Sequence, residues 1–283
     1  MSDHQIVSRR LILAAAGLSV LGAAGCGGAR RAGEPGTAPR GNAGPPPAAA
    51  PPAAAPEAAP AAAPEAAPET APEAAPEAPR VLTEAESRPL FELAEEGKVV
   101  ALTIDDGPHP RHTPDVLALL EKHGIRATFF LIGENAAARP DLVREIAARG
   151  HRIGNHTWSH PDLRHLPDDA QVREELTRTS DLLAGITGKS PVWFRAPGGD
   201  WAPRTLRTSR ELGMRPMGWT VDPEDWAEPG TDVILGRLTK EMRPGAIVLT
   251  HDGGGDRSQT VAALTRFLPS LIDSGYRFTT PRA

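Results

Sequence analysis

The chain has 283 residues and a formal net charge of −5. An acidic chain offers no basic surface for nucleic acid, so nucleic-acid binding is disfavoured. The single cysteine, Cys26, excludes an internal disulfide, and the folded part must therefore be held together by its core, with or without a metal ion.

The first 26 residues predict an export signal. Arg9 and Arg10 precede an apolar stretch, residues 11–24, that is too short for a membrane span of about 20 residues. The region around the arginines is typical of a twin-arginine signal, and the residues before Cys26 resemble a lipoprotein cleavage box, although Ala23 stands where leucine is usual. We expect an exported protein, lipidated at Cys26, on the outer face of the cytoplasmic membrane or in the cell wall. Secretion after nearby cleavage, or an uncleaved anchor, are the alternatives.

Residues 27–80 consist mainly of Pro, Ala, Gly and Glu, with Ala-Ala-Pro-Glu repeated at 54–57, 62–65, 66–69 and 74–77. This composition cannot bury a core, and the regular prolines block a continuous helix. We predict a disordered, semi-rigid linker, with a partner-binding segment as the alternative. Residues 81–96 are expected to lead into the folded domain as a short helix with Leu90 and Leu93 facing inward.

From Gly97 onward, apolar runs of strand length alternate with amphipathic runs of helix length. The predicted strands are Lys98–Asp105, Ala127–Gly133, Arg152–His156, Val192–Ala196, Arg215–Val221, Ala246–His251 and Tyr276–Thr280. The predicted helices are Thr113–His123, Arg139–Arg149, Asp168–Thr187, Pro203–Leu212, Asp232–Glu241 and Ser258–Asp273.

Strict alternation implies parallel strands, in either an open doubly wound sheet or a short (β/α) barrel. The first strand is followed by Gly107-Pro108-His109-Pro110 instead of a glycine-rich phosphate loop, which argues against a nucleotide-binding fold. We therefore predict an α/β fold with a distorted (β/α) barrel of about seven parallel strands in residues 97–283. Reactive groups of such folds gather at the C-terminal ends of strands, where this chain has Asp105, Asp106, His156, Arg195, Asp222, Asp225 and His251.

His156 and His160 are spaced i and i+4, so on a helical turn they would lie on one face within reach of one ion. Thr157 stands where zinc proteases of the His-Glu-x-x-His type carry their catalytic glutamate, so a base must come from elsewhere, and Asp105 is available. With Asp106 the histidines make a two-histidine, one-carboxylate site with an open position. Zinc is the first expectation, and Fe(II), Co(II) or Ni(II) suit the same ligands. Taken alone, a histidine pair at this spacing caps a turn about as often as it binds a metal.

Five segments, in chain order, resemble the motifs of the polysaccharide deacetylases of carbohydrate esterase family four, the NodB-homology domain. They are Thr103-Ile104-Asp105-Asp106-Gly107-Pro108, His156-Thr157-Trp158-Ser159-His160, Arg195-Ala196-Pro197-Gly198-Gly199, Asp222-Pro223-Glu224-Asp225-Trp226 and Leu249-Thr250-His251. The resemblance covers residues 97–283 and implies that they form the catalytic domain.

The resemblance implies that Asp106, His156 and His160 bind the metal. It also implies that Asp105 is the base that removes a proton from water attacking an acetamide carbonyl. The chemistry agrees, because a metal lowers the pKa of its bound water to near 7 and a carboxylate then suffices as base.

By the same resemblance His251 is the general acid for the leaving amine, and Asp225 raises the pKa of its imidazole. Arg195 would orient Asp105. Trp226 and Leu249 match residues that line the substrate groove and the pocket for the acetyl methyl group. Taken alone, either side chain is more simply explained as core.

One position departs from the family. Gly198 replaces a common aromatic residue, so that side-chain contact is absent, while the backbone N–H that the family uses to stabilise the oxyanion is kept. A flexible Gly198-Gly199 pair also holds that donor less firmly.

The leading hypothesis is a metal-dependent N-deacetylase acting on an N-acetylated cell-wall or extracellular glycan, such as peptidoglycan or a chitin-like polymer. An O-deacetylase of acetylated xylan is one alternative, and a non-catalytic glycan-binding domain is another. The expected partners are the glycan and, through Cys26, the membrane. We expect a monomer.

Overall fold

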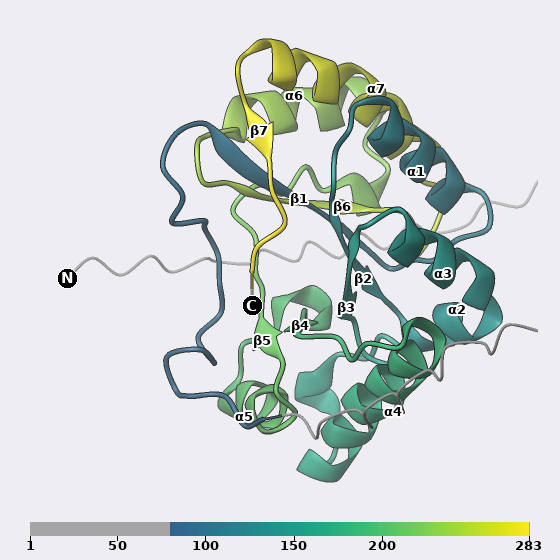
Figure 1. The fold of residues 1–283 in the computed structure, drawn as a ribbon, viewed down its shortest axis with the longest axis vertical. Coiled ribbons are helices and arrows are strands. Elements are labelled where there is room, and N and C mark those ends of the chain that lie inside the picture. The colour runs from purple at the N-terminus through teal and green to yellow at the C-terminus, as the bar shows by residue number, and fades with distance from the viewer. Residues whose placement is uncertain (1–79, 283) are drawn as a thin grey trace, which may run out of the picture. The chain divides into compact units, whose positions relative to one another are not determined.

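A ring of parallel strands organises residues 80–282, the part of the chain that the computed structural model describes (Figure 1). The strand order is β5-β4-β3-β2-β1-β6, with β7 paired to β1, and every pair is parallel. The strands are β1 (Val99–Asp105), β2 (Thr128–Leu131), β3 (Arg152–Asn155), β4 (Trp193–Phe194), β5 (Arg215–Pro216), β6 (Ile247–His251) and β7 (Arg277–Phe278). The predicted distorted barrel is confirmed.

β1 is the central strand, and all seven of its residues are buried. Packing on both faces explains why its sequence is an almost continuous apolar run. It pairs with β7 at Val99 and Val100 and with β2 and β6 further along. The register places Asp105 between Phe130 of β2 and His251 of β6. The ends of these strands therefore meet at one edge of the ring.

Helices cover the outside of the ring, with α6 and α7 side by side at one end and α4 and α5 at the other (Figure 1). The α-helices are α1 (His112–Lys122), α2 (Gly133–Ala138), α3 (Pro140–Ala148), α4 (Asp169–Thr187), α5 (Pro203–Glu211), α6 (Thr231–Glu241) and α7 (Ser258–Asp273). Short 3-10 turns are η1 (Leu163–His165), η2 (Pro197–Gly199) and η3 (Asp225–Ala227). All six predicted helices are present. The sequence missed α2, because six residues are too few to show helical periodicity.

The ring closes irregularly between β5 and β6. β5 is shorter than predicted, and Val221 beyond it makes only one isolated bridge, to Val248. The lead-in segment fills the rest of the gap, since Leu90 bridges to Met217 and Glu92 bridges to Ala246. The segment is thus built into the barrel wall.

The short helix expected at residues 81–96 is therefore wrong. The segment has one turn, near residues 84–87, and is otherwise extended. Pro89 lacks a backbone N–H and disfavours helical geometry in the residue before it. The backbone N–H of Leu90 donates to Pro216 (3.0 Å) and that of Leu93 to Gly245 (2.8 Å). Both leucines pack against the barrel interior, as expected.

The interior of the barrel is filled by a small apolar cluster of Ala101, Phe130, Trp193, Met217 and Ile247. A larger cluster lies between the strands and the surrounding helices. A filled interior leaves the open end of the ring, at the C-terminal ends of the strands, as the place for chemistry.

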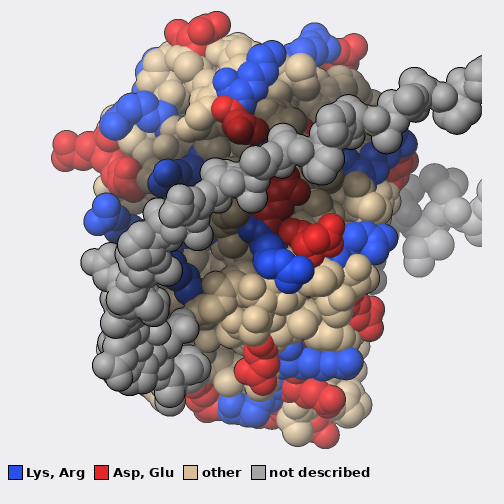
Figure 2. Space-filling view, turned by 45° about the vertical axis from the view of Figure 1, so that its right-hand side comes forward, with Lys and Arg blue, Asp and Glu red and all other residues tan. Residues whose placement is uncertain are grey.

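The predicted export signal at 1–26 and nearly all of the predicted linker at 27–80 lie outside the described residues. Within residues 80–282 no helix is long and apolar enough to cross a membrane. On the face shown in Figure 2, basic and acidic side chains are interspersed and form no large field of one sign.

Candidate active site

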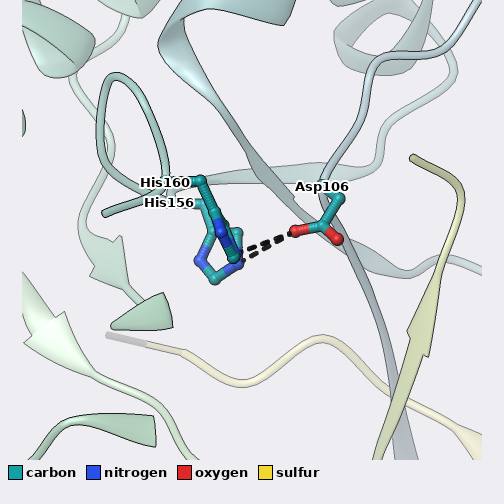
Figure 3. A group of neighbouring side chains, drawn as sticks. All are labelled: Asp106, His156 and His160. Atoms are coloured by element: carbon teal, nitrogen blue, oxygen red, sulfur yellow. Dashed lines mark ion pairs between the residues drawn. The ribbon is translucent and has the colours of Figure 1, made fainter. Parts of the chain in front are cut away.

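Three side chains from two strand ends converge on one point (Figure 3). Asp106 follows β1, while His156 and His160 lie in the loop after β3. The Nε2 atoms of both histidines are 3.3 Å from Oδ1 of Asp106. The three ligand atoms lie within 4.8 Å of one another, which is the spacing of a site for one metal ion.

The loop after β3 is not the helical turn that the histidine spacing suggested. Thr157 and His160 have left-handed backbone conformations, with φ of 68° and 59°. Glu175 of α4 holds the loop, because its Oε2 accepts the backbone N–H groups of Trp158 and Ser159, both at 2.8 Å. The predicted convergence of the histidines is right, but a tertiary contact produces it instead of a helix.

The surroundings of the three side chains fit a cation. Nδ1 of His156 lies 2.7 Å from the carbonyl oxygen of Arg195, so this nitrogen carries the proton and Nε2 presents a lone pair. That lone pair faces Oδ1 of Asp106, which is buried and accepts no hydrogen bond from the described part of the chain. Two acceptors that face each other repel unless a cation or a proton lies between them. The donor set of two imidazoles and one carboxylate suits zinc and related divalent ions.

Asp106 is ionised in this environment. Burial alone would raise the pKa of its carboxyl. When no cation lies between the groups and the imidazoles are protonated, hydrogen bonds and positive charge from His156 and His160 outweigh burial and hold this pKa well below its usual range. A deprotonated carboxylate is the form that binds a metal.

Asp105 points into the barrel, because it shares one face of β1 with Ala101 and Thr103. Its Oδ1 accepts a hydrogen bond from Nη1 of Arg195 (2.8 Å), and its Oδ2 lies 3.6 Å from Nε2 of His156. Arg195 is fully buried, donates also to Thr103 Oγ1 (2.7 Å) and has two further main-chain acceptors. The predicted contact between Arg195 and Asp105 is therefore present, and it turns Oδ2 toward His156 and the candidate metal site.

His251 and Asp225 form a second buried pair. Nδ1 of His251 lies 2.7 Å from Oδ1 of Asp225, whose Oδ2 accepts the backbone N–H of His251 (2.9 Å). Burial lowers the pKa of His251, but the hydrogen bond and charge of Asp225 more than offset it and raise the pKa to about 9. The imidazole is then protonated at neutral pH, with Nε2–H available to donate a proton.

The sequence missed two residues that support this pair. Thr260, in the first turn of α7, donates its hydroxyl to Oδ2 of Asp225 (2.8 Å). Arg257 is 2% exposed and forms no ion pair within residues 80–282, yet its guanidinium donates to the carbonyls of Asp225, Trp226 and Gly253. Neither residue belongs to a motif, so only the packing of α7 identifies them.

Gly253 connects Arg257 to the candidate metal site of Asp106, His156 and His160. A Cβ atom at Gly253 would overlap the backbone carbonyl of Asp106, so the loop after β6 lies directly against that residue. Arg257 donates to the carbonyl of Gly253 on one side and to that of Asp225 on the other. It thus links the loop packed on Asp106 to the residue that pairs with His251, the predicted acid.

The predicted substrate-contacting residues have different surroundings. Trp226 is 55% exposed, so core packing does not explain it. Leu249 is buried in β6 opposite Thr103, and its contact with substrate stays a prediction. Gly198, with φ of 63°, has no atom within 4 Å of where a Cβ would stand, so the space next to it is open. Cys26 lies outside the described residues.

Residues 93–217 match the family model described as polysaccharide deacetylase. A peptidoglycan-N-acetylglucosamine deacetylase of Bacillus cereus is 41% identical over 192 residues, which cover 67% of this chain and 89% of that protein. The chain belongs to the polysaccharide deacetylase family. A chitooligosaccharide deacetylase of a Bradyrhizobium species is 43% identical over 189 residues, which cover 62% of the enzyme and 86% of the relative.

A solved structure agrees with the fold of the enzyme. The crystal structure of a peptidoglycan N-acetylglucosamine deacetylase, in complex with a naphthalenyl N-hydroxybenzamide, superposes with a TM-score of 0.65 at 36% identity. The match covers 68% of the enzyme and 89% of that chain. The enzyme is thus a hydrolase that deacetylates polysaccharides, on a barrel shared with solved members of its family.

Proposed function

We propose that the enzyme removes N-acetyl groups from an N-acetylated glycan of the cell envelope, peptidoglycan or a chitin-like polymer, in a reaction that requires a divalent cation and releases acetate. Two of the similar proteins carry peptidoglycan and chitooligosaccharide in their names. The observation that carries the proposal is the placement of Asp105 next to the Asp106, His156 and His160 group, with His251 on the neighbouring strand.

Asp106, His156 and His160 would hold the cation, with zinc as the first candidate. When bound, such an ion polarises a carbonyl oxygen and lowers the pKa of water. The bond between Nδ1 of His156 and the carbonyl of Arg195 fixes the tautomer in which Nε2 is a ligand.

Asp105 acts as the base. Its Oδ1 is occupied by Arg195, which leaves Oδ2 to take the proton of the water that attacks the acetamide carbon. The carbon–nitrogen bond then breaks, and Nε2–H of His251 protonates the departing amine. Asp225 keeps His251 in the protonated form. The backbone N–H of Gly198 is the proposed donor to the oxyanion.

Substrate profiling tests the proposal. Acetate released from purified peptidoglycan, chitin oligomers and acetylated xylan is measured with and without a chelator, for the wild type, Asp106→Asn and an Asp181→Asn control. Asp181 is exposed on α4 and lies outside the site. We expect release from an N-acetylated glycan that stops with the chelator and in Asp106→Asn, while the control keeps the wild-type rate.

The three substrates separate the alternatives. Release from acetylated xylan alone would make the enzyme an O-deacetylase. If no substrate gives chelator-sensitive release, the proposal fails and a glycan-binding domain becomes the better interpretation.

We also propose that the enzyme is exported and lipidated at Cys26, on the strength of the twin-arginine-like and cleavage-box sequences at its N-terminus. Labelling cells with a radioactive fatty acid tests this. We expect label on the wild type and none on Cys26→Ala, and an unlabelled wild type would refute lipidation.

A further inference from the structure

Three aromatic side chains form a row that leads away from Arg195. The guanidinium carbon of Arg195 is 5.5 Å from the ring centroid of Trp219. The rings of Trp219 and Trp201 are 6.4 Å apart, and those of Trp201 and Phe91 are 5.5 Å apart in an edge-to-face arrangement. We call Trp219, Trp201 and Phe91 the aromatic row.

The row borders the segment that holds the proposed oxyanion donor. A Cβ atom at Gly199 would stand 3.0 Å from Trp219 and 3.6 Å from Nε1 of Trp201. The neighbouring Gly198 has open space where a side chain would be. The row therefore lies against Gly199, the residue next to the proposed donor, and the side-chain position of the donor residue itself is open.

The outer end of the row is accessible and held in place. Phe91 is 42% exposed, while Trp201 and Trp219 are half-buried. A Cβ atom at Gly218 would overlap the ring of Phe91, so this ring lies flush against the strand segment after β5. The bridge of the adjacent Leu90 to Met217 fixes the backbone there.

Trp201 offers a polar group as well as a ring. A buried indole N–H normally finds a partner, as that of Trp193 does in the carbonyl of Pro281 (3.2 Å). Trp201 is only half-buried, and its N–H is not among the buried side-chain atoms of residues 80–282 that lack a partner, so it is open to solvent or to a ligand. A sugar ring presents C–H groups on its face and hydroxyl groups on its edge, which complement an aromatic ring with a free donor.

We propose that the aromatic row binds a neutral pyranose ring of the glycan, next to the sugar that loses its acetyl group. The inference rests on the proposed function, because the row extends the same substrate site. It assigns a role to Phe91, which precedes residues 93–217 that match the family model. The bridge between Leu90 and Met217, which joins the lead-in segment to the barrel wall, would then also hold Phe91 in the substrate site.

The test compares Phe91→Ala, Trp201→Ala and Trp201→Phe with the wild type on N-acetylated chitooligosaccharides of two to six sugars. Val233→Ala is the control, since Val233 is 43% exposed on α6 and lies outside the row. We expect the KM for the hexamer to rise about tenfold in both alanine variants, with kcat within about twofold. The difference from wild type should shrink as the oligomer shortens, and Trp201→Phe should restore part of the affinity.

Binding without turnover separates this inference from the proposed function. Calorimetric titration of the chelator-treated protein with the N-acetylated hexamer should show a Kd about tenfold weaker in Phe91→Ala and Trp201→Ala than in the wild type. Thermal unfolding midpoints of the variants identify any that are misfolded. An unchanged KM and Kd in Phe91→Ala would overturn the inference even if the wild type is active. An equal loss of kcat at every oligomer length would also overturn it, because it would indicate a structural role.

Discussion

Asp105 and Asp106 are neighbours in the chain with different surroundings. Asp105 is the last residue of β1 and is held by Arg195 inside the barrel. The backbone of Asp106 is left-handed, with φ of 72°, and its side chain meets His156 and His160. This one change of backbone direction separates the proposed base from the proposed metal ligand.

Replacing Asp105 by Asn should lower turnover at least about 100-fold and leave the metal content unchanged, because the substitution removes the proton acceptor and keeps all three ligands. Acetate release measures the turnover, and elemental analysis of the same preparation measures the metal content. Activity close to that of the wild type would show that Asp105 is not the base.

The pH dependence of kcat/KM reports on His251. The reaction needs the protonated imidazole, so activity should be lost as the pH rises through the pKa of His251, about 9. Asp225→Asn removes the group that raises this pKa while burial still lowers it, so the alkaline limb should move to lower pH. Asp181→Asn should leave the limb in place. An unmoved limb in Asp225→Asn would contradict the assignment of His251 as the acid.

At the scale of elements, the loop after β3 depends on α4. Glu175 binds the loop through two backbone N–H groups and the hydroxyl of Ser159. Glu175→Gln should weaken zinc affinity roughly tenfold, as loss of a group that orients metal ligands commonly does. Glu174→Gln is the matched control, because Glu174 is the exposed neighbour on the same helix. Equal zinc affinities in a competition titration with a chromophoric chelator would refute this role of Glu175.

The sequence predicted the strand ends and the groups they bring together, because hydrophobic periodicity and motif spacing are local properties. It suggested a helical turn for the loop that carries His160, whereas the loop is not helical. The conformation of this loop depends on Glu175, which lies fifteen residues further along the chain. Arg257 and Thr260 were missed for the same reason, since their contacts with Asp225 join separate elements. Long-range hydrogen bonds leave no periodic signal in a sequence.

At the scale of the whole domain, the lead-in segment closes the ring. Leu90 and Leu93 pack on the interior cluster, so the double variant Leu90→Ala, Leu93→Ala should lose about 2 kcal/mol of stability. The unfolding midpoint should then fall by roughly 4–8 °C. Val81→Ala, at a residue that is 58% exposed, should unfold at the wild-type temperature. If the double variant unfolds at the same temperature as the wild type, the lead-in segment is not part of the barrel wall.

We propose that Asp106, His156 and His160 together hold the divalent ion that deacetylation requires. The most direct test is the metal content of purified wild type and His160→Ala after equilibration with zinc and removal of the excess. We predict close to one zinc ion per wild-type chain and strongly reduced occupancy in His160→Ala, in which one of three ligands is lost. Equal zinc content in the two proteins would contradict the claim.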